Sequence, residues 1–465
     1  MEGEVKKFYN AASNIADFLE THLRRKSRIK INTDTDPDGI SAGNIIARCL
    51  NYFDIPFHIS FGGPPEEEDL KELNRQDYDL FLFLDQGTGQ YQIINEYLLE
   101  KNEEVLILDH HPGETENRTG FNHLNPHSFN LSGAKDVSSS GVAYSVIKQI
   151  DERFESLSEI ALIGALGDRQ EGPSGFSGIN QEILNRSREN DFIRTENGLK
   201  LNNRGLPIPE CLSRTIRPFL RGLSGNKDKC EELITGLGFE IETTIQELNE
   251  EEEKELRDEI LKTIKIESPE NLKNSLWGTI YISQTDQIAG PKNLNEYVTL
   301  LDSCEKSNKV EIGFSAMLGD ETYGEKAHDI TKKYQKNMIE VMNWLVSEED
   351  RIKTTPQFRY LDIEEEFKSK MIGEILSIAI ESGLVKNNKP LIGLAKINEN
   401  KLKVSARASA EYVKSGPPLG EVLHKISEEL EGSGGGHNVA AAARIPYERK
   451  DEFIKKVDKF LKNHK

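Results

Sequence analysis

The chain has 465 residues, which is enough for about three domains of ordinary size with large buried cores. Its 79 acidic and 59 basic residues give a net charge of -20, which argues against a protein that coats nucleic acid through a general positive field. Any contacts with phosphate groups are therefore expected to be local.

Neither zinc nor disulfide chemistry is indicated. The four cysteines, Cys49, Cys211, Cys230 and Cys304, are far apart and form no CxxC pair. The opening stretch MEGEVKKFYN lacks the apolar core of a signal peptide, and no run approaches the roughly 18 apolar residues of a membrane span. We therefore expect a protein of the reducing cytoplasm that makes no membrane contact.

Residues 1–200 alternate apolar runs, polar tips and helical stretches, a pattern typical of a parallel α/β sheet. Four runs are predicted as strands, each ending in a polar tip. The tips are DTDPDG at 34–39, Asp85 after LFLFL, Asp109 with His110 and His111 after VLIL, and Asp168 after IALIGALG. Because ligands bind at the carboxyl ends of the strands in open parallel sheets, we expect the four tips to converge on one site.

The stretch DTDPDG also resembles the start of a calcium-binding EF-hand loop. Such a loop needs a bidentate Glu at its twelfth position, which here is Ile45, and Pro37 lies inside the loop. A cluster of Asp and His side chains instead suits manganese or magnesium. Two such ions about 3.5–4 Å apart would clamp a phosphate and turn a water into hydroxide for in-line attack.

Each tip also has a plainer interpretation. Taken alone, Asp85 is more often a turn residue, the GDRQ around Asp168 is more often a helix cap, and adjacent histidines are sometimes polar loop residues. All four polar tips follow a predicted strand, and this shared position favours a common site.

The rest of the chain is predicted to hold an inserted α/β domain at 205–320, a connecting helix at 321–355 and a smaller α/β domain at 356–465. The helix is predicted from apolar residues at steps of three and four. They are Ala327, Ile330, Tyr334, Met338, Val341 and Leu345. The acidic run at 249–259 is expected to be a solvated helix face, or a surface that repels nucleic acid or presents charge to a protein partner.

Basic residues are concentrated locally. The segment RRKSRIK at 24–30 and the arginines Arg214, Arg217 and Arg221 are candidates for contacts with a nucleic-acid backbone, although RRKSRIK also fits a basic helix end.

A glycine run near the C-terminus, GSGGGHN at 432–438, precedes an alanine-rich stretch that we expect to be a helix. Glycines let the backbone approach a phosphate closely, and the positive end of a helix would face it. His437 adds a side-chain donor, and Arg407 can bind a phosphate in a bidentate way.

The motifs DTDPDG, LDQG, LDHHP and GALGDRQ, in this order and spacing, resemble the four motifs of the DHH phosphoesterase superfamily. SARAS at 405–409 and GSGGGHNVAAAARIP from Gly432 resemble the substrate-binding motifs of the DHH-associated C-terminal domain. The stretches RPFLRGLSG, ELITGLGFEI and NEYVTLLDSCEKS resemble the archaeal RecJ-like, or GINS-associated, nucleases. The resemblance spans most of the chain.

The resemblance implies a two-metal exonuclease of single-stranded DNA or RNA, acting 5′→3′ in DNA replication or repair, with GINS as a partner. Its metal ions would be manganese or magnesium, held by Asp36, Asp38, Asp85, His110 and Asp168. His111 would face the scissile phosphate, and Asp109 would orient the histidine pair. The implied substrate contacts come from Ser405, Arg407, Gly434, Gly435, Gly436 and His437.

One departure from the family pattern is Asn32, where many members have a histidine. Asparagine is a poor ligand, so the first metal is expected to bind more weakly, or Asp34 or water completes its shell. Asn32 keeps open a second interpretation, a weakly catalytic or non-catalytic replisome subunit that binds GINS and the helicase. A phosphodiesterase of short oligonucleotides or cyclic dinucleotides is a third, which the large insert disfavours.

Overall fold

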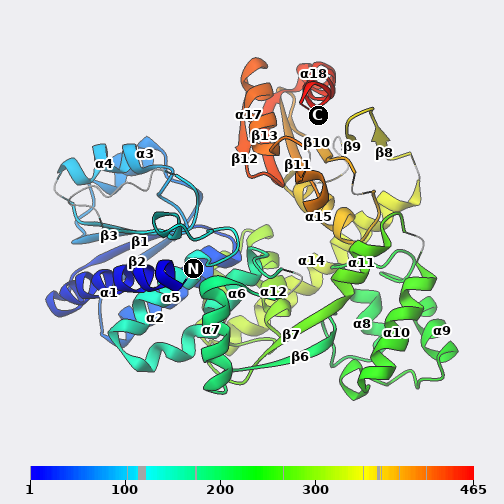
Figure 1. Ribbon diagram of the computed structural model, residues 1–465, viewed down its shortest axis with the longest axis horizontal. Helices are drawn as coiled ribbons and strands as arrows, with labels where there is room; N and C mark the ends of the chain where they lie inside the picture. The colour runs from blue at the N-terminus through cyan, green and yellow to red at the C-terminus, as the bar shows by residue number, and fades with distance from the viewer. Residues whose placement is uncertain are drawn as a thin grey trace. The chain divides into compact units, whose positions relative to one another are not determined.

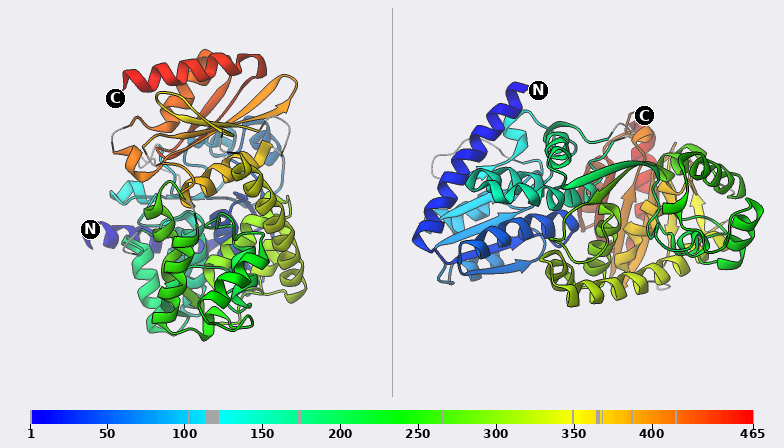
Figure 2. Two further views of the ribbon diagram at one scale, coloured as in Figure 1. Left: turned by 90° about the vertical axis from the view of Figure 1, so that its right-hand side faces the viewer. Right: turned by 90° about the horizontal axis from the view of Figure 1, so that it is seen from below.

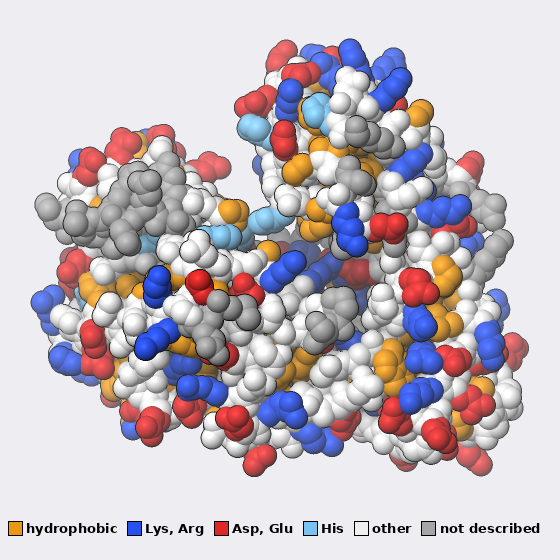
Figure 3. All heavy atoms as spheres, viewed as in Figure 1, with side chains coloured by type: hydrophobic (Ala, Val, Ile, Leu, Met, Phe, Trp, Pro, Cys, Tyr) orange, Lys and Arg blue, Asp and Glu red, His pale blue; other side chains and the backbone are white. Residues whose placement is uncertain are grey.

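The computed structural model describes residues 2–101, 103–113, 122–172, 175–264, 266–348, 350–363, 367, 369–386, 388–414 and 416–464. The chain forms two compact units (Figure 1). The first comprises Met1–Asn197 and Thr279–Lys332, and the second comprises Gly198–Gly278 and Lys333–Lys465. Acidic and basic side chains are interspersed over the face shown in Figure 3, as expected for a chain with 30% charged residues.

The first unit is built on a five-stranded parallel sheet with the strand order β2-β1-β3-β4-β5. Its strands are β1 (Ile29–Thr33), β2 (Phe57–Phe61), β3 (Leu80–Leu84), β4 (Val105–Leu108) and β5 (Asn122–Leu124). This sheet confirms the predicted α/β fold, and the strands expected before DTDPDG, Asp85 and the histidine pair are β1, β3 and β4.

Helices cover both faces of this sheet (Figure 1). Phe81 and Phe83 of β3 pack with α3 (Glu67–Leu73) and α4 (Tyr91–Tyr97). The alternating leucines of β3 pack in the main core instead, because successive side chains of a strand point to opposite faces. The helices of that core are α1 (Glu2–Arg25), α2 (Pro37–Tyr52), α5 (Ser139–Ile150), α6 (Ser158–Gly167), α7 (Gly178–Glu189), α12 (Leu294–Lys306) and α13 (Val310–Met317).

The strand predicted before Asp168 is wrong. The segment Ser158–Gly167 forms the helix α6, and Asp168 is its C-terminal capping residue. Nine of the ten residues of α6 are buried, all except Gly167. A helix surrounded on all sides has no polar face, so its continuous apolar sequence cannot be told from that of a buried strand.

The second unit contains a helical part and a sheet. The helices α8 (Ile208–Arg214), α9 (Lys227–Gly236), α10 (Glu250–Thr263) and α11 (Pro269–Leu276) enclose one apolar core. The six-stranded sheet has the order β12-β13-β11-β10-β9-β8. Its strands are β8 (Ile352–Thr354), β9 (Arg359–Asp362), β10 (Leu391–Asn398), β11 (Lys401–Arg407), β12 (Ser433–Gly436) and β13 (Ala440–Pro446).

Three helices and a short turn complete the second unit. The helices α17 (Leu419–Glu429) and α18 (Lys450–Asn463) cover one face of the sheet. Figure 2 shows α18, in red, beside the strands of this sheet. The helix α15 (Ile372–Glu381) packs on the other face, against Leu361, Leu391 and Ala395, and α16 (Ala410–Val413) is a single turn.

The region predicted as one insert is divided between the units. Residues 205–278 belong to the second unit and residues 279–320 to the first. The strands β6 (Ile193–Leu199) and β7 (Trp277–Ser283) pair in a two-stranded sheet.

The predicted long helix is confirmed as α14 (Glu321–Ser347), although it ends before residue 355. Its apolar stripe is buried, with Ala327 in the core of the first unit and Met338 in that of the second. The acidic run likewise forms a helix, α10, whose N-terminal capping residue is Asn249. Glu253 of this helix is buried rather than solvated. Its Oε1 lies 3.0 Å from Nη2 of Arg204 in an ion pair.

The helix predicted after the glycine run is also wrong, because Ser433–Gly436 and Ala440–Pro446 form the paired strands β12 and β13. The alanine-rich stretch alternates between buried and more exposed side chains, with Ala441 and Ala443 in the core. A Cβ on Gly434 would lie 2.6 Å from the Cβ of Ala443, so glycine permits this close packing. Alanine favours helices intrinsically, but tertiary packing overrides that preference here.

Several basic candidates are engaged within the protein. Arg217 pairs with Glu374 and Glu381, and Arg28 lies 2.6 Å from Asp77. The guanidinium of Arg217 therefore belongs to an internal ion-pair network. The four cysteines are buried free thiols, and no helix among the described residues is long and apolar enough to cross a bilayer.

Candidate metal centre

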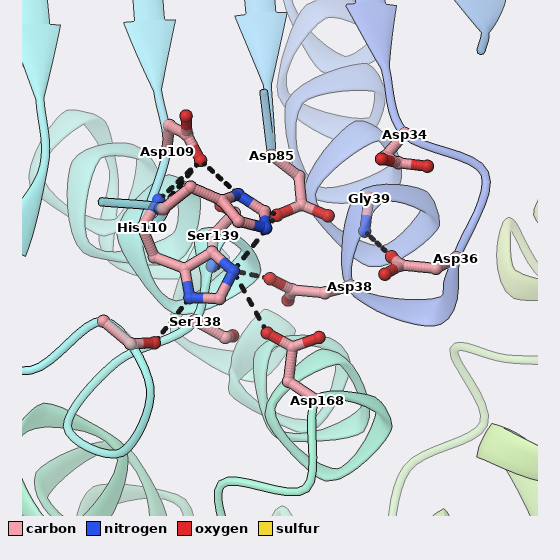
Figure 4. Close-up of polar contacts among 12 residues, drawn as sticks. Asp34, Asp36, Asp38, Gly39, Asp85, Asp109, His110, Ser138, Ser139 and Asp168 are labelled. Carbon is pink, nitrogen blue, oxygen red and sulfur yellow. Dashed lines mark hydrogen bonds and ion pairs between the residues drawn. The ribbon is translucent and has the colours of Figure 1, made fainter. Parts of the chain in front are cut away.

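The acidic and histidine tips of the first unit meet at one edge of its sheet (Figure 4). The DTDPDG loop follows β1, Asp85 follows β3, and Asp109, His110 and His111 follow β4. These are neighbouring parallel strands, so their carboxyl ends lie side by side. Asp168 joins them from the C-terminal end of α6 rather than from a strand.

The DTDPDG loop is shaped by the start of α2. Asp36 caps this helix, because its Oδ1 accepts a hydrogen bond of 2.9 Å from the Gly39 amide. Pro37 occupies the first turn, where a missing N–H group costs nothing. A Cβ on Gly39 would lie 2.6 Å from the carbonyl oxygen of Asp34, so only glycine fits this turn. The cap places Asp38 in the first turn of α2.

Asp38 is completely buried and faces the N-terminus of α5. It accepts hydrogen bonds from the backbone amides of Ser139, at 2.7 Å, and Ser140, at 3.0 Å. A carboxylate is stabilised at this position by the orphan amides and the positive end of the helix. These serines were not predicted as site residues, although SSSG before an apolar helical run is a sequence signal for a helix N-terminus.

Asp109 orients the histidine pair, as the resemblance implies. Its Oδ1 accepts from the backbone amides of His110, at 2.7 Å, and His111, at 3.1 Å, and from Nδ1 of His111 at 2.9 Å. Its Oδ2 accepts from the Thr88 amide at 3.0 Å. Burial favours the neutral acid, but these donors, with His111 foremost, hold the pKa of Asp109 well below its usual range.

His110 lies between two carboxylates. Its Nδ1 donates to the carbonyl oxygen of Gly133 at 2.5 Å, which directs Nε2 toward the site. Nε2 is 3.3 Å from Oδ1 of Asp85 and 3.1 Å from Oδ2 of Asp168. Among the described residues, two sets of potential ligand atoms lie within 4.8 Å of one another: Asp38, His110 and Asp168, and Asp85, His110 and His111.

The electrostatics of the cluster indicate an excess of negative charge. Burial, and then the neighbouring carboxylates, raise the pKa values of Asp85 and Asp168 well above the usual range for aspartate. Burial and Asp36 raise the pKa of Asp34 to about 6. Although burial opposes it, the surrounding carboxylates raise the pKa values of His110 and His111 to about 9.

These residues fit a divalent cation. Oδ1 of Asp85 is buried and forms no hydrogen bond of good geometry with a described residue, so an acceptor points into the site unsatisfied. Carboxylate oxygens with imidazole nitrogen are the donors that manganese and magnesium accept. A cation here would also balance the crowded carboxylates.

Asp85 has a special backbone conformation, with a φ of 58°. This left-handed region is uncommon for residues other than glycine and costs of order 1 kcal/mol or more. Such outliers gather at functional sites, where the surrounding structure holds them in place. The sequence predicts the place of Asp85 at the end of a strand but not this backbone conformation.

Asp34 and Asp36 lie outside the two ligand sets, and Asn32 lies in β1 beside them in sequence. The Nδ2 atom of Asn32 is buried and has no hydrogen-bond partner among the described residues. The position where a family histidine is expected thus carries an unsatisfied amide.

Gln170 supports the site and was not predicted. Its Nε2 donates to the Gly133 carbonyl oxygen at 2.9 Å, the same atom that accepts from His110. Asn180 in turn donates to Oε1 of Gln170 at 2.6 Å. Gln170 is therefore held in a buried chain that fixes the orientation of His110.

The predicted substrate residues belong to the second unit. Ser405 and Arg407 project from the same face of β11, because they are two residues apart. Nε of Arg407 donates to Oγ of Ser377 on α15 at 3.0 Å, which positions the guanidinium. Gly434, Gly435 and Gly436 lie in β12, and His437 follows at the turn before β13.

A partly buried histidine near the site predicts a pH-dependent stability. Burial lowers the pKa of His123 to about 4, and its Nε2 lies 3.0 Å from Oγ1 of Thr88. As pH falls from about 6.5 toward 4, the imidazole of His123 is protonated in the unfolded chain before it is protonated in the folded chain. The free energy of unfolding of the wild type should therefore fall relative to that of His123→Asn, by up to about 3 kcal/mol. Urea unfolding at several pH values measures the difference, and a constant difference would contradict the expectation.

Two family models match the chain. The DHH family N-terminal domain matches residues 28–167, which contain all the acidic and histidine tips except Asp168. The DHHA1 domain matches residues 357–463, which contain the sheet with Arg407 and the glycine run.

Among curated proteins, an uncharacterised protein of Methanocaldococcus jannaschii is 28% identical over 448 residues, covering 95% of each chain. The single-stranded-DNA-specific exonuclease RecJ of Thermus thermophilus is 35% identical over 107 residues, covering 22% of this chain and 16% of RecJ.

Solved structures show the same fold. RecJ of Thermus thermophilus in complex with Mn²⁺ has a TM-score of 0.60 at 16% identity, covering 97% of this chain and 55% of RecJ. That RecJ was also solved with Mg²⁺. CDC45 of Entamoeba histolytica has a TM-score of 0.66 at 12% identity, covering 98% of this chain and 99% of CDC45. The chain thus matches the DHH family N-terminal domain and the DHHA1 domain over separate segments, and it shares its fold with RecJ.

Proposed function

We propose that the protein is a metal-dependent phosphodiesterase that removes nucleotides from an end of single-stranded DNA, or of RNA, in the 5′→3′ direction during DNA replication or repair. The observation that carries this proposal is the convergence of Asp38, Asp85, His110 and Asp168 at one edge of the sheet. The match to the exonuclease RecJ supports the choice of substrate.

In this proposal, Asp36, Asp38, Asp85, His110 and Asp168 hold two divalent ions, manganese or magnesium. Such ions, when bound, neutralise charge on the phosphate and acidify a water molecule at neutral pH. The Nδ1–H of His110 is already committed to Gly133, which leaves Nε2 to act as a ligand. Asp38 is held in place by two backbone amides, so it needs no rearrangement to bind a cation.

His111 is proposed to contact the scissile phosphate. Its Nδ1 is bonded to Asp109, which fixes the orientation of the ring, and its Nε2 is proposed to donate a proton to a non-bridging phosphate oxygen or to the leaving group. The side chain of His111 is 38% exposed, whereas that of His110 is only 10% exposed, which suits one histidine for substrate and the other for metal. Asp109 acts through His111 as a positioning residue.

The C-terminal sheet is proposed to bind the substrate through Ser405, Arg407, the amides of Gly434, Gly435 and Gly436, and His437. Nε of Arg407 donates to Ser377 and Nη1 donates to the carbonyl oxygen of Ala406 at 2.9 Å, which fixes the orientation of the guanidinium that is proposed to meet a phosphate.

A second candidate is a replisome subunit that binds GINS and the helicase and hydrolyses nucleic acid weakly or not at all. Two observations favour it: the likeness of the fold to CDC45 over nearly the whole chain, and Asn32 at the position of the family histidine. The first candidate is preferred because the carboxylates and histidines of the centre are all present.

Single-stranded DNA labelled at either end tests the two candidates. The protein is incubated with Mn²⁺, Mg²⁺ or EDTA, together with an Asp85→Asn variant and a dinucleotide as a short substrate. The nuclease proposal expects metal-dependent release of mononucleotides, with the 5′ label freed first, and loss of release in Asp85→Asn.

The other outcomes are equally informative. Cleavage of the dinucleotide alone would assign a small-substrate phosphodiesterase. No cleavage with either metal would overturn the nuclease proposal, and co-elution of the protein with purified GINS in gel filtration would then support the subunit.

A further inference from the structure

One asparagine joins the ends of three neighbouring strands beside the candidate metal centre. Asn125 follows β5 and is completely buried. Its Nδ2 donates to Oγ1 of Thr88, in the loop after β3, at 3.1 Å, and to the carbonyl oxygen of His111, after β4, at 3.0 Å. Its Oδ1 accepts from the backbone amide of His127 at 3.0 Å and so caps the short helix η2 (Pro126–Phe129). Because β3, β4 and β5 are adjacent in the sheet, one side chain reaches all three ends.

The orientation of this amide is fixed by its partners. The carbonyl oxygen of His111 can only accept a hydrogen bond, and the backbone amide of His127 can only donate one. A reversed side chain would place oxygen against oxygen and nitrogen against nitrogen, which would leave both groups unsatisfied. The three bonds use both hydrogens of Nδ2 and one acceptor position of Oδ1. Asn125 is therefore held in one orientation and, being completely buried, does not meet a substrate itself.

His111 is thereby held from two sides. Asp109 accepts from its backbone amide at 3.1 Å and from its ring Nδ1 at 2.9 Å, and Asn125 donates to its carbonyl oxygen. The next residue is Pro112, which has no N–H group, so the carbonyl oxygen of His111 is the only hydrogen-bonding group of the peptide link between them. Loss of the bond from Asn125 would let the backbone of His111 shift and carry the imidazole with it.

The support of the other histidine is separate. The ring of His110 is oriented by the carbonyl oxygen of Gly133, which also accepts from Gln170. Neither of these bonds involves Asn125. A change at Asn125 is therefore expected to disturb the histidine that is proposed to contact the substrate, while the histidine that is proposed to bind metal keeps its orientation.

We propose that Asn125 is a positioning residue: by fixing the main chain of His111, it holds the imidazole where the scissile phosphate binds. This inference rests on the proposed function and adds to it a residue that touches neither metal nor substrate. Misplacing a catalytic group by about 1 Å can cost on the order of 100-fold in rate. The loss should appear in kcat, because His111 is proposed to act in the transition state, whereas KM and the affinity for metal should stay unchanged.

The test compares Asn125→Ser with a matched control, Asn44→Ser. Serine keeps an oxygen that can cap η2 but lacks the two N–H donors of the amide. Asn44 of α2 is also completely buried and donates to the carbonyl oxygen of Phe314 at 3.3 Å, so both variants lose an amide donor in the interior. Both should therefore melt at a lower temperature than the wild type.

The two variants should differ in turnover. On labelled single-stranded DNA with Mn²⁺, Asn125→Ser should lower kcat by about 10–100-fold. Its KM, and its Kd for Mn²⁺ from calorimetric titration, should stay close to the wild-type values, and Asn44→Ser should keep the wild-type kcat. If Asn125→Ser does not fold, Thr88→Val replaces it, because this change removes only the hydroxyl that anchors the Asn125 amide. The same pattern is then expected with a smaller fall in kcat.

Hydrogen–deuterium exchange in EDTA tests the same contact without catalysis. The backbone amides of His110 and His111 donate to Asp109, and they should exchange faster in Asn125→Ser than in the wild type or in Asn44→Ser. If the wild type hydrolyses nothing, the proposed nuclease fails, and this exchange alone decides whether Asn125 holds His111.

Several results would overturn the proposal. An equal fall of kcat in the two serine variants would show a general effect of lost stability. A fall in Mn²⁺ affinity that accounts for the fall in kcat would assign Asn125 to the support of the metal ligands instead. Unchanged exchange of the His110 and His111 amides in Asn125→Ser, or an unchanged kcat, would show that His111 does not need this bond.

Discussion

Replacing Asp38 by asparagine is expected to lower the rate of phosphodiester hydrolysis by at least ~1,000-fold. The change removes a negative charge from a completely buried position and turns an amide group toward the Ser139 and Ser140 amides, which donate to Asp38 in the wild type. Loss of a residue that only orients a metal ligand typically costs about 10–100-fold, so loss of a proposed ligand should cost more. Initial rates on labelled single-stranded DNA with saturating Mn²⁺ measure the effect.

The matched control is Asp54→Asn, which makes the same chemical change on an exposed residue with a φ of 50°. Asparagine tolerates this conformation, so the rate and the stability should both stay close to those of the wild type. A rate within tenfold of the wild type in a folded Asp38→Asn variant would show that Asp38 is not a ligand that catalysis requires.

Gly164→Ala is expected to damage the site from a neighbouring helix. A Cβ at this position of α6 would lie 2.1 Å from Oγ of Ser140 and 2.2 Å from Oδ1 of Asp38, so both side chains must move. Overpacking of this kind typically costs about 1–3 kcal/mol of stability. Displacing Asp38 should also weaken Mn²⁺ binding by about 10–100-fold. Urea unfolding and calorimetric titration with Mn²⁺ measure the two effects.

Gly236→Ala provides the control for this change. Gly236 lies in α9, and a Cβ there would meet no atom within 4 Å. Alanine is favoured over glycine in a helix by up to about 1 kcal/mol, so this variant should be as stable as the wild type or more so, with unchanged Mn²⁺ binding. If Gly164→Ala behaved in the same way, the close approach of α6 to Asp38 would be wrong.

Much of the site could be predicted because three of its tips follow strands with clear signals. LFLFL before Asp85 and VLIL before Asp109 are short apolar runs bounded by polar residues, and both are strands of the parallel sheet. Because these two strands are parallel neighbours, the polar residues that follow them lie at the same edge of the sheet. The histidine pair and the DTDPDG loop were therefore placed correctly from sequence order and topology.

The errors came from features that local sequence does not encode. The sequence predicts a strand at α6 because burial removes the polar face that reveals a helix, and it predicts a helix at β13 because alanine favours helices. The amides of Ser139 and Ser140 and the carbonyl of Gly133 are main-chain groups, which any residue could supply at those positions. Their roles depend on how distant segments pack.

The most direct test of the metal centre is anomalous diffraction from crystals soaked in Mn²⁺, recorded at the manganese absorption edge. The account predicts strong peaks among the side chains of Asp38, Asp85, His110 and Asp168, and weaker peaks or none in Asp38→Asn. An absence of peaks at these residues, in crystals that bind Mn²⁺ elsewhere, would contradict it.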